Sequence, residues 1–290
     1  MPVGFVIENE QLIVRQSFDF PTVYLDHWAI RHFSTEKEDG QRFINALKVA
    51  GGALIISHTN LAEITGPSDP RHAEEIATFL EAILPNIFFA QFNIELAMKQ
   101  EVGARVIGFR LMAPPDIELL QEVARQRPND FRPFTISGVI KIIAEHRERL
   151  GITWRNSNRS IANRINAMRC DANFIETART FSGHPQNIPT LAVFQELLRP
   201  IFLDQRLRID LNDAADIQHA TMAIAYCDFV LLDGKWKDMH SRMKRRFVEL
   251  GLKIPTARVF SARSKGVAEF LSVLEGTNSN NFNNSSETRE

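Results

Sequence analysis

Short apolar runs alternate with helix-like segments in two separate blocks of this 290-residue chain. The strand-like runs are 22–25, 53–57 and 87–91 in the first block, and 229–232 and 258–261 in the second. Helical spacing of apolar residues fills the intervals, over 41–50, 59–64, 71–84, 93–107, 212–227 and 235–250, and a final helix follows the last run. Alternation of this kind predicts an α/β fold, with a mostly parallel sheet covered by helices on both faces.

The segment 108–204 departs from this alternation, because its pattern is almost purely helical. Helices are expected over 116–126, 136–150, 161–179 and 189–203, with clusters of Pro, Gly, Asn and Ser between them. We interpret the segment as an all-helical insertion into one α/β domain formed by 22–107 and 205–275. Residues 1–21 are then an N-terminal extension. Residues 276–290 lack core-forming side chains and are expected to be a disordered tail.

Composition narrows the functional classes. The chain is 44% hydrophobic and 24% charged, as in ordinary globular proteins, and its formal net charge of −1 requires any basic surface to be local. Cys170 and Cys227 are too few for a disulfide framework or a thiolate zinc site. The start of the chain lacks the pattern of a secretory signal, and no apolar run approaches the roughly 20 residues that span a bilayer. A reducing cytoplasm and no membrane partner are therefore expected.

Five carboxylates fall at points where a parallel sheet would gather them into one pocket. Three of them lie at or just after strand-like runs, and the set is Asp26, Glu63, Asp213, Asp216 and Asp233. Open α/β sheets bind ligands outside the carboxyl ends of their strands. Acids collected there from distant segments can hold hard divalent cations through oxygen ligands. This arrangement suits metal-assisted hydrolysis of a phosphodiester bond.

Each acid also has a purely structural interpretation. Asp26 could cap the helix that follows it, and Asp233, which precedes a glycine, could be a turn residue. Glu63 lies in the first turns of a helix, where the helix dipole favours negative charge. Asp213 is well placed as a helix N-cap, with Asp216 three residues later on the same face. Two carboxylates crowded together repel unless a cation neutralises them, and this favours a metal site.

The acidic motifs, taken in order, resemble those of PIN-domain nucleases. The resemblance rests on TVYLD, ISHTNLAEI and DIQHATMAIAYCDFVLLD, and it covers about 22–107 and 212–261. It implies a magnesium- or manganese-dependent endoribonuclease whose catalytic, metal-binding acids are Asp26, Glu63, Asp216 and Asp233. The chain departs from the family at His27 and Trp28, where small polar residues are usual. It is also about twice as long as the compact toxin nucleases, owing to the helical insertion.

Two further residues could support the acids. His219 follows Asp216 by one helical turn, and it is either a catalytic side chain or a hydrogen-bonded packing residue. Hydroxide generated on a metal needs no side-chain base, and this favours the second interpretation. Ser57, at the carboxyl end of a strand, could support a ligand or a water molecule, or it could cap the following helix.

Two basic stretches are candidates for nucleic-acid binding. The helix after Asp233 has a local excess of Lys and Arg, and the residues proposed to contact phosphates there are Arg242, Lys244, Arg245 and Arg246. In the insertion, Arg155, Arg159 and Arg164 lie near Trp154, which could stack on an unpaired base. The alternative for both stretches is an ordinary solvated helix face.

RNA is the expected partner, with single-stranded DNA as the alternative substrate. Two other functional classes stay open. The first is a non-catalytic nucleic-acid-binding or scaffold protein on the same fold, although retention of all four acids argues against it. The second is a phosphohydrolase of small metabolites, which would normally carry a second Asp two residues after the first, where this chain has Trp28. An inhibitory partner protein and a homo-oligomer also stay open.

Overall fold

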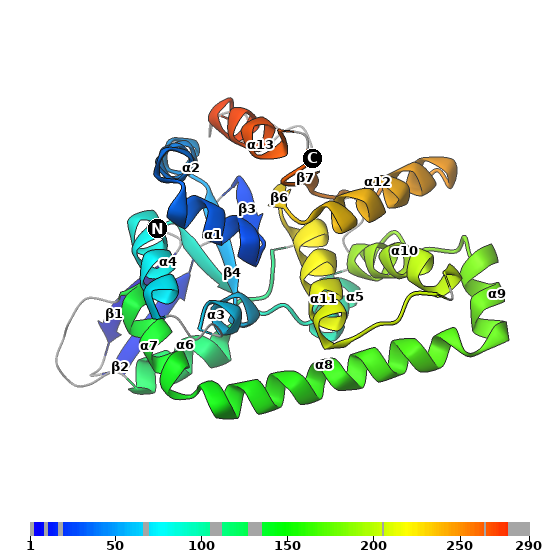
Figure 1. The fold of residues 1–290 in the computed structure, drawn as a ribbon, viewed down its shortest axis with the longest axis horizontal. Helices are drawn as coiled ribbons and strands as arrows, with labels where there is room; N and C mark the ends of the chain where they lie inside the picture. Colours follow the sequence, from blue (N-terminus) through cyan, green and yellow to red (C-terminus); the bar gives the residue numbers. More distant parts are fainter. Residues whose placement is uncertain are drawn as a thin grey trace.

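A five-stranded, all-parallel sheet forms the centre of the protein (Figure 1). The computed structural model describes residues 3–8, 11–16, 20–65, 70–104, 112–126, 135–204, 206–263 and 265–277, and of Trp154 it describes only the backbone. The strands are β3 (Thr22–Leu25), β4 (Ala53–Ser57), β5 (Ile87–Ala90), β6 (Phe229–Leu231) and β7 (Arg258–Phe260). Their order across the sheet is β5-β4-β3-β6-β7. This confirms the predicted α/β class, with a topology consistent with that of PIN domains.

The strand order reverses beside β3. From β3 the chain adds β4 and β5 on one side, and it returns later to add β6 and β7 on the other. Val23 pairs with both Leu54 and Phe229, so the central strand is hydrogen-bonded along both edges. A crevice outside the carboxyl ends of the strands at such a reversal is where open α/β sheets bind ligands.

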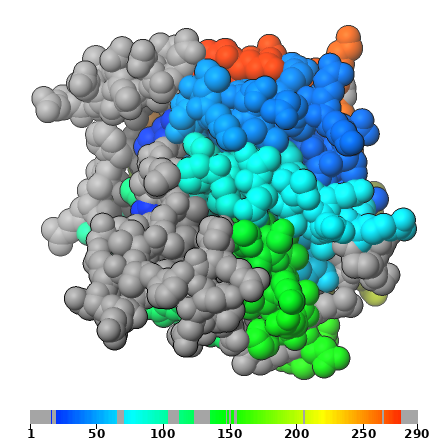
Figure 2. Space-filling model, turned by 90° about the vertical axis from the view of Figure 1, so that its left-hand side faces the viewer, coloured from blue at the N-terminus to red at the C-terminus, as the bar shows by residue number. Residues whose placement is uncertain are grey.

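The helices of the first block cover the sheet. They are α1 (His27–Thr35), α2 (Lys37–Ala50), α3 (His58–Ile64), α4 (Pro70–Ile83) and α5 (Ile94–Ala104). All but α1 were predicted. The pattern over α1 is short, and Glu36 separates it from α2. On one face of the molecule, α4 lies between α2 and the helix of residues 136–145 (Figure 2).

The segment 108–204 is helical where it is described. Its helices are α6 (Ile117–Gln126), α7 (Ile136–Glu145), α8 (Arg147–Arg169), α9 (Ala172–Thr180) and α10 (Pro189–Leu203). The predicted break after residue 150 and the predicted continuity of 161–179 are wrong. The chain bends at His146 instead, and α8 runs on through Gly151 and the Asn/Ser-rich stretch after it. It persists because α8 packs along α11 (Leu211–Tyr226), burying Ala162 and Ile165.

The second break falls at Asp171. This residue is the N-cap of α9, and its carboxylate accepts hydrogen bonds from Asn173 N at 2.9 Å and Phe174 N at 3.3 Å. Such a cap satisfies amides that would otherwise lack partners at the start of the helix. The local chemistry of one aspartate therefore ends one helix and starts the next, inside a stretch whose apolar spacing is continuous.

The last helices follow the predicted pattern. They are α11, α12 (Gly234–Glu249) and α13 (Gly266–Glu275). Gly276 is the C-cap of α13, and Thr277 is buried and donates from N to Leu274 O at 3.1 Å, so these two residues are not part of a disordered tail. The remainder of the predicted tail lies outside the described residues. Within the described part of the chain, no helix has the length and apolarity needed to cross a membrane.

The N-terminal extension contains a hairpin that the sequence pattern did not reveal. Strands β1 (Val3–Glu8) and β2 (Gln11–Gln16) pair antiparallel. The Gln16 amide donates to Phe89 O at 3.2 Å and accepts from Phe89 N at 2.7 Å. This exchange joins the end of the hairpin to β5, an edge strand of the main sheet. Edge strands left open invite pairing with other chains, and the contact covers part of this edge.

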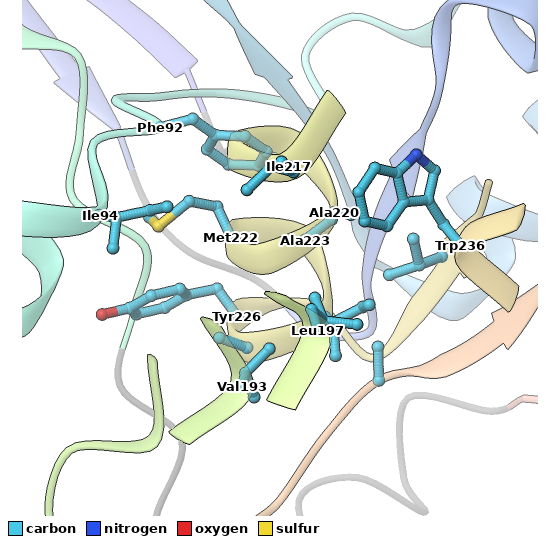
Figure 3. Packing of buried hydrophobic residues seen from close by; sticks show 14 of the residues in the cluster. Phe92, Ile94, Val193, Leu197, Ile217, Ala220, Met222, Ala223, Tyr226 and Trp236 are labelled. Atoms are coloured by element: carbon cyan, nitrogen blue, oxygen red, sulfur yellow. The ribbon is translucent and has the colours of Figure 1, made fainter. Parts of the chain in front are cut away.

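Two hydrophobic clusters cover the two faces of the sheet. Alternate residues of β3 point to opposite faces, with Tyr24 in one cluster and Val23 and Leu25 in the other. Around α11, Met222 and Tyr226 pack among residues of α5 and α10 (Figure 3). Helices from the segment 108–204 contribute to both clusters, α8 and α10 to the first and α6 and α7 to the second.

The close approach of α1 and α2 depends on Gly40. A Cβ at this position would lie 2.2 Å from the carbonyl oxygen of Phe33 in α1. We therefore expect Gly40→Ala to force the two helices apart and to lower the free energy of unfolding by about 1–3 kcal/mol. Gly103→Ala is the matched control, because a Cβ in that helix meets nothing within 4 Å. Chemical denaturation of the wild-type protein and both variants measures the change in the free energy of unfolding. A Gly40→Ala variant as stable as the wild-type protein would contradict the prediction.

Candidate metal centre

Two of the predicted acids stand side by side at the carboxyl edge of the sheet. Asp26 directly follows β3, and Asp233 comes two residues after β6. Leu25 pairs with Leu231 in the ladder between these strands, and Asp26 N donates to Leu231 O at 3.0 Å. The register of one strand pair therefore sets the relative position of the two carboxylates.

Each of these acids also caps a helix. The Asp26 carboxylate accepts from His27 N at 2.8 Å at the start of α1. The Asp233 carboxylate accepts from Lys235 N at 2.8 Å and from Trp236 N at 3.2 Å at the start of α12. The structural interpretation of Asp26 is thus correct, but it does not exclude the other one. One oxygen of each carboxylate makes the cap, and the other is left for a ligand.

The other two acids come from neighbouring helices. Glu63 lies on α3, which follows β4, and Asp216 lies in the second turn of α11. Their proximity is electrostatic as well as topological. After burial, which is the largest cause, the charges of Asp26 and Asp216 raise the pKa of Glu63, and those of Asp216 and Asp233 raise the pKa of Asp26. Four segments far apart in sequence therefore bring the four carboxylates within electrostatic reach of one another.

Burial dominates the acidity of this group. Desolvation is the largest cause that raises the pKa of Asp26 to about 7 and that of Glu63 to about 8. Burial followed by the charge of Asp233 raises the pKa of Asp216 to about 6, while Lys235 opposes the shift. The indole N–H of Trp236 also lowers this pKa, although its geometry falls short of a hydrogen bond. At neutral pH Asp26 and Glu63 therefore retain part of their protons, because burial and neighbouring carboxylates raise the pKa of both.

The donor set fits a hard divalent cation. All four side chains offer carboxylate oxygens, the ligands that Mg²⁺ and Mn²⁺ prefer. Glu63 Oε2 is buried and has no hydrogen-bond partner within the described structure, which is a costly state for an ionised oxygen. A cation bound there would satisfy it. Among the described residues, no three His, Cys, Asp or Glu side chains already stand in the geometry of a formed metal site.

Asp213 has a different environment from the other acids. The predicted N-cap role is wrong, because the N-cap of α11 is Asp210, whose carboxylate accepts from Asp213 N at 2.9 Å. Asp213 closes the capping box by accepting from Asp210 N at 3.3 Å, and it also accepts from Lys235 Nζ at 2.6 Å. Its charge therefore has a cation already, and its role as a metal ligand stays a prediction.

A buried chain of hydrogen bonds lies behind the acids. Ser57 caps α3 and donates from Oγ to Asn60 Oδ1 at 2.9 Å, so the capping interpretation of this serine is correct. Asn60 Nδ2 then donates to the Tyr24 hydroxyl at 3.1 Å, and this hydroxyl lies 2.9 Å from His219 Nδ1. The tautomer of the His219 imidazole decides which of these two groups donates the hydrogen bond.

His219 is buried at the end of this chain. Its Nε2 has no hydrogen-bond partner among the described residues. Burial lowers the pKa of this imidazole to about 3, so the ring is neutral. His219 is accordingly a buried, hydrogen-bonded residue that packs between Tyr24 and its neighbours, as one of the two interpretations predicted. Tyr24 and Asn60 were missed, although Asn60 is three residues after a capping serine, a spacing that signals a capping box.

The predicted phosphate contacts separate into two groups. Arg242, Lys244 and Arg245 are exposed on α12. Arg246 instead donates from Nε to Glu196 at 3.0 Å and from Nη2 to Phe181 O at 2.6 Å. These bonds hold α12 against α10 and the end of α9. Most of the Arg246 guanidinium is therefore used in packing these helices together.

The arginines of the insertion lie on an external helix. Arg155, Arg159 and Arg164 are exposed on α8, and the side chain of Trp154 lies outside the described residues. Helix α8 contacts α11 and α3, the two helices that carry Asp216 and Glu63. The arginines thus lie on a helix that contacts two helices carrying acids, but within the described structure no hydrogen bond or ion pair joins the arginines to those acids.

Comparison with known proteins found no relative of this chain. No protein-family model, no curated protein and no solved structure matches the chain. The similarity to PIN-domain nucleases consequently rests on the acidic motifs and on the strand order.

The raised pKa values predict how stability depends on pH. Above pH 7 the unfolded acids are fully ionised, whereas folded Asp26 and Glu63 keep part of their protons until about pH 8. The folded state then binds more protons, so stability falls as the pH rises from 7 to about 8.5. Each tenfold change in an ionisation constant corresponds to about 1.4 kcal/mol, so a loss on the order of 1–2 kcal/mol is expected.

Thermal unfolding in the presence of a chelator measures this loss. Adding Mn²⁺ or Mg²⁺ should restore stability, and most at the higher pH, because a cation neutralises the ionised acids. Glu63→Gln should flatten the pH dependence, while the exposed Asp238→Asn should leave it unchanged. Melting that does not change with pH in the chelated wild-type protein would contradict the electrostatic coupling of these acids.

Proposed function

We propose that this protein is a metal-dependent endoribonuclease that hydrolyses RNA phosphodiester bonds at the four clustered acids. The observation that carries the proposal is their convergence at the strand-order reversal of a parallel sheet. The order and spacing of the acidic motifs, which resemble those of PIN-domain nucleases, support the same reaction.

The acids would hold Mg²⁺ or Mn²⁺ between β3, β6, α3 and α11. Such a cation, when bound, lowers the pKa of a coordinated water and neutralises charge on the phosphate. The helix caps at Asp26 and Asp233 fix the orientation of these carboxylates, and the hydrogen-bonded chain behind them holds α3 and α11 in place. Because burial keeps protons on the acids, we expect metal binding to release protons at neutral pH.

Removing one acid tests the reaction directly. Asp26→Asn and Asp216→Asn should each lower RNA cleavage in Mn²⁺ by more than about 100-fold, since direct ligands matter more than the outer-shell partners that cost 10–100-fold. Both variants should remain folded and should melt above the wild-type protein in chelator, because each removes a repulsive buried carboxylate. Asp238→Asn, on the exposed side of α12, is the control for loss of charge alone.

Purified protein and mixed RNAs, with and without Mn²⁺, are sufficient for this assay. Wild-type cleavage that persists in Asp26→Asn would remove these acids from the mechanism. RNA binding without cleavage by the metal-loaded wild-type protein would favour a non-catalytic scaffold. Parallel incubation with single-stranded DNA distinguishes the two candidate substrates.

The exposed arginines of α8 provide a separate prediction about specificity. Replacing Arg155, Arg159 and Arg164 together with Trp154 by Ala should change which RNA is preferred, or raise the RNA concentration needed for cleavage by roughly tenfold. Metal binding, measured by calorimetry, should not change, because these residues lie outside the acid cluster. Cleavage at the same sites with unchanged efficiency would make α8 an architectural helix.

The cellular setting follows only from composition. Cys170 and Cys227 are not joined in a disulfide, and the first is exposed while the second is buried. A reducing, cytoplasmic location is therefore part of the proposal. Control by an inhibitory protein or by self-association is compatible with it.

A further inference from the structure

A groove of about 830 Å³ lies between α10 and α12, along the second half of α12. The two helices run beside each other in Figure 1. The groove has a partly apolar lining formed by Pro200, Leu203 and Met243. Arginines line it from both sides, Arg199 and Arg206 from α10 and the loop after it, and Arg242, Arg245 and Arg246 from α12.

Two of these arginines are available for a ligand. Among the described residues, Arg242 and Arg245 are exposed and have neither a hydrogen-bond nor an ion-pair partner. Arg199 is held by two backbone carbonyls, Ala178 O at 2.9 Å and Arg179 O at 2.8 Å. Carbonyls orient its guanidinium but leave its charge uncompensated.

The acids of the groove do not cancel this charge. Glu196 is buried and bound to both Arg246 and His184, and Asp204 is paired with Arg206 at 3.1 Å. Glu249 is the one lining acid with no such pair in the described structure. Five arginines against three acids leave a net of two positive charges, concentrated at Arg199, Arg242 and Arg245.

We propose that this groove binds the phosphate groups of the RNA strand that leaves the acid site. The inference rests on the proposed function, and it adds a second contact region with defined residues. Exposed guanidinium groups match phosphate oxygens in charge and geometry, and the apolar lining suits riboses or bases. Lys244 lies on the same helix but does not line the groove, so it is not assigned to it.

The length of α12 sets the distance between the acid site and the groove. Helix α12 begins at Gly234, beside Asp233, and rises about 1.5 Å per residue, so Arg242 and Arg245 lie about 12 and 17 Å along it. A stacked strand rises about 3.4 Å per nucleotide, so this distance corresponds to about four or five nucleotides. Short RNAs bound at the acids should therefore not reach the groove.

Equilibrium binding to oligouridylates tests this length dependence. The protein is used as Asp26→Asn, which should not cleave, with short (about two nucleotides) and long (about twelve nucleotides) fluorescent probes. Arg242→Ala/Arg245→Ala should weaken binding of the long probe by about tenfold, and the log–log salt slope should become shallower by about 1.4, or about 0.7 per lost contact. Binding of the short probe should not change.

Lys99→Ala/Lys253→Ala is the matched control. It removes two exposed positive charges outside the groove, and it should leave the affinity for both probes unchanged. Equal losses of affinity in the two double variants would show that the probe responds only to general positive charge on the surface. This result would contradict the assignment of RNA binding to the groove. Unchanged binding of the long probe to Arg242→Ala/Arg245→Ala would overturn it as well.

Competition with free ATP shows whether the groove binds the phosphates of an RNA strand or those of a free nucleotide. If ATP competes with the long probe only weakly, the groove is built for a strand, as proposed. If ATP binds in a manner that requires Arg242 and Arg245 while the long probe does not, the groove is a nucleotide site and the assignment to RNA is wrong. Probe binding and ATP competition do not depend on cleavage. An absence of nuclease activity would therefore contradict the proposed function but would not test RNA binding in the groove.

Discussion

The hydrogen-bond ladder between β3 and β6 is the contact on which the site depends. It joins the first and fourth strands of the main sheet in chain order, which are separated by about 200 residues, and it brings Asp26 beside Asp233. Because β3 also pairs with β4, Glu63 on the following helix reaches the same edge. Asp216 comes from α11, and this helix is held in place because most of its residues are buried.

Bringing these acids together carries an energetic penalty that the fold must offset. Burial and mutual repulsion favour their protonated forms, and ionising them without a counterion is unfavourable. The surrounding structure offsets this with helix caps on Asp26 and Asp233 and with the buried chain from Ser57 through Tyr24 to His219. Sites that break the usual rules of stability in this way are often functional.

The segment 108–204 is integrated with the sheet and does not stand apart from it. Its helices supply side chains to both hydrophobic clusters, and α8 contacts helices that carry two of the acids. Helix α10 packs on α11, and through Glu196 and Arg246 it is also joined to α12. The same pairing that fixes these helices leaves a groove between them, so the insertion shapes a surface as well as filling a core.

Local pattern was sufficient for the strands of the sheet, for most helices and for the position of Asp26 and Asp233 just after strands, because alternation and helical periodicity are properties of neighbouring residues. It did not reveal the N-terminal hairpin, α1 or the unbroken length of α8, nor that Asp210 caps α11 in place of Asp213. It also could not show that Arg246 is bound to Glu196, or that Tyr24 and Asn60 support the acids. These features depend on partners that are distant in sequence, and only the packed structure determines which partners meet.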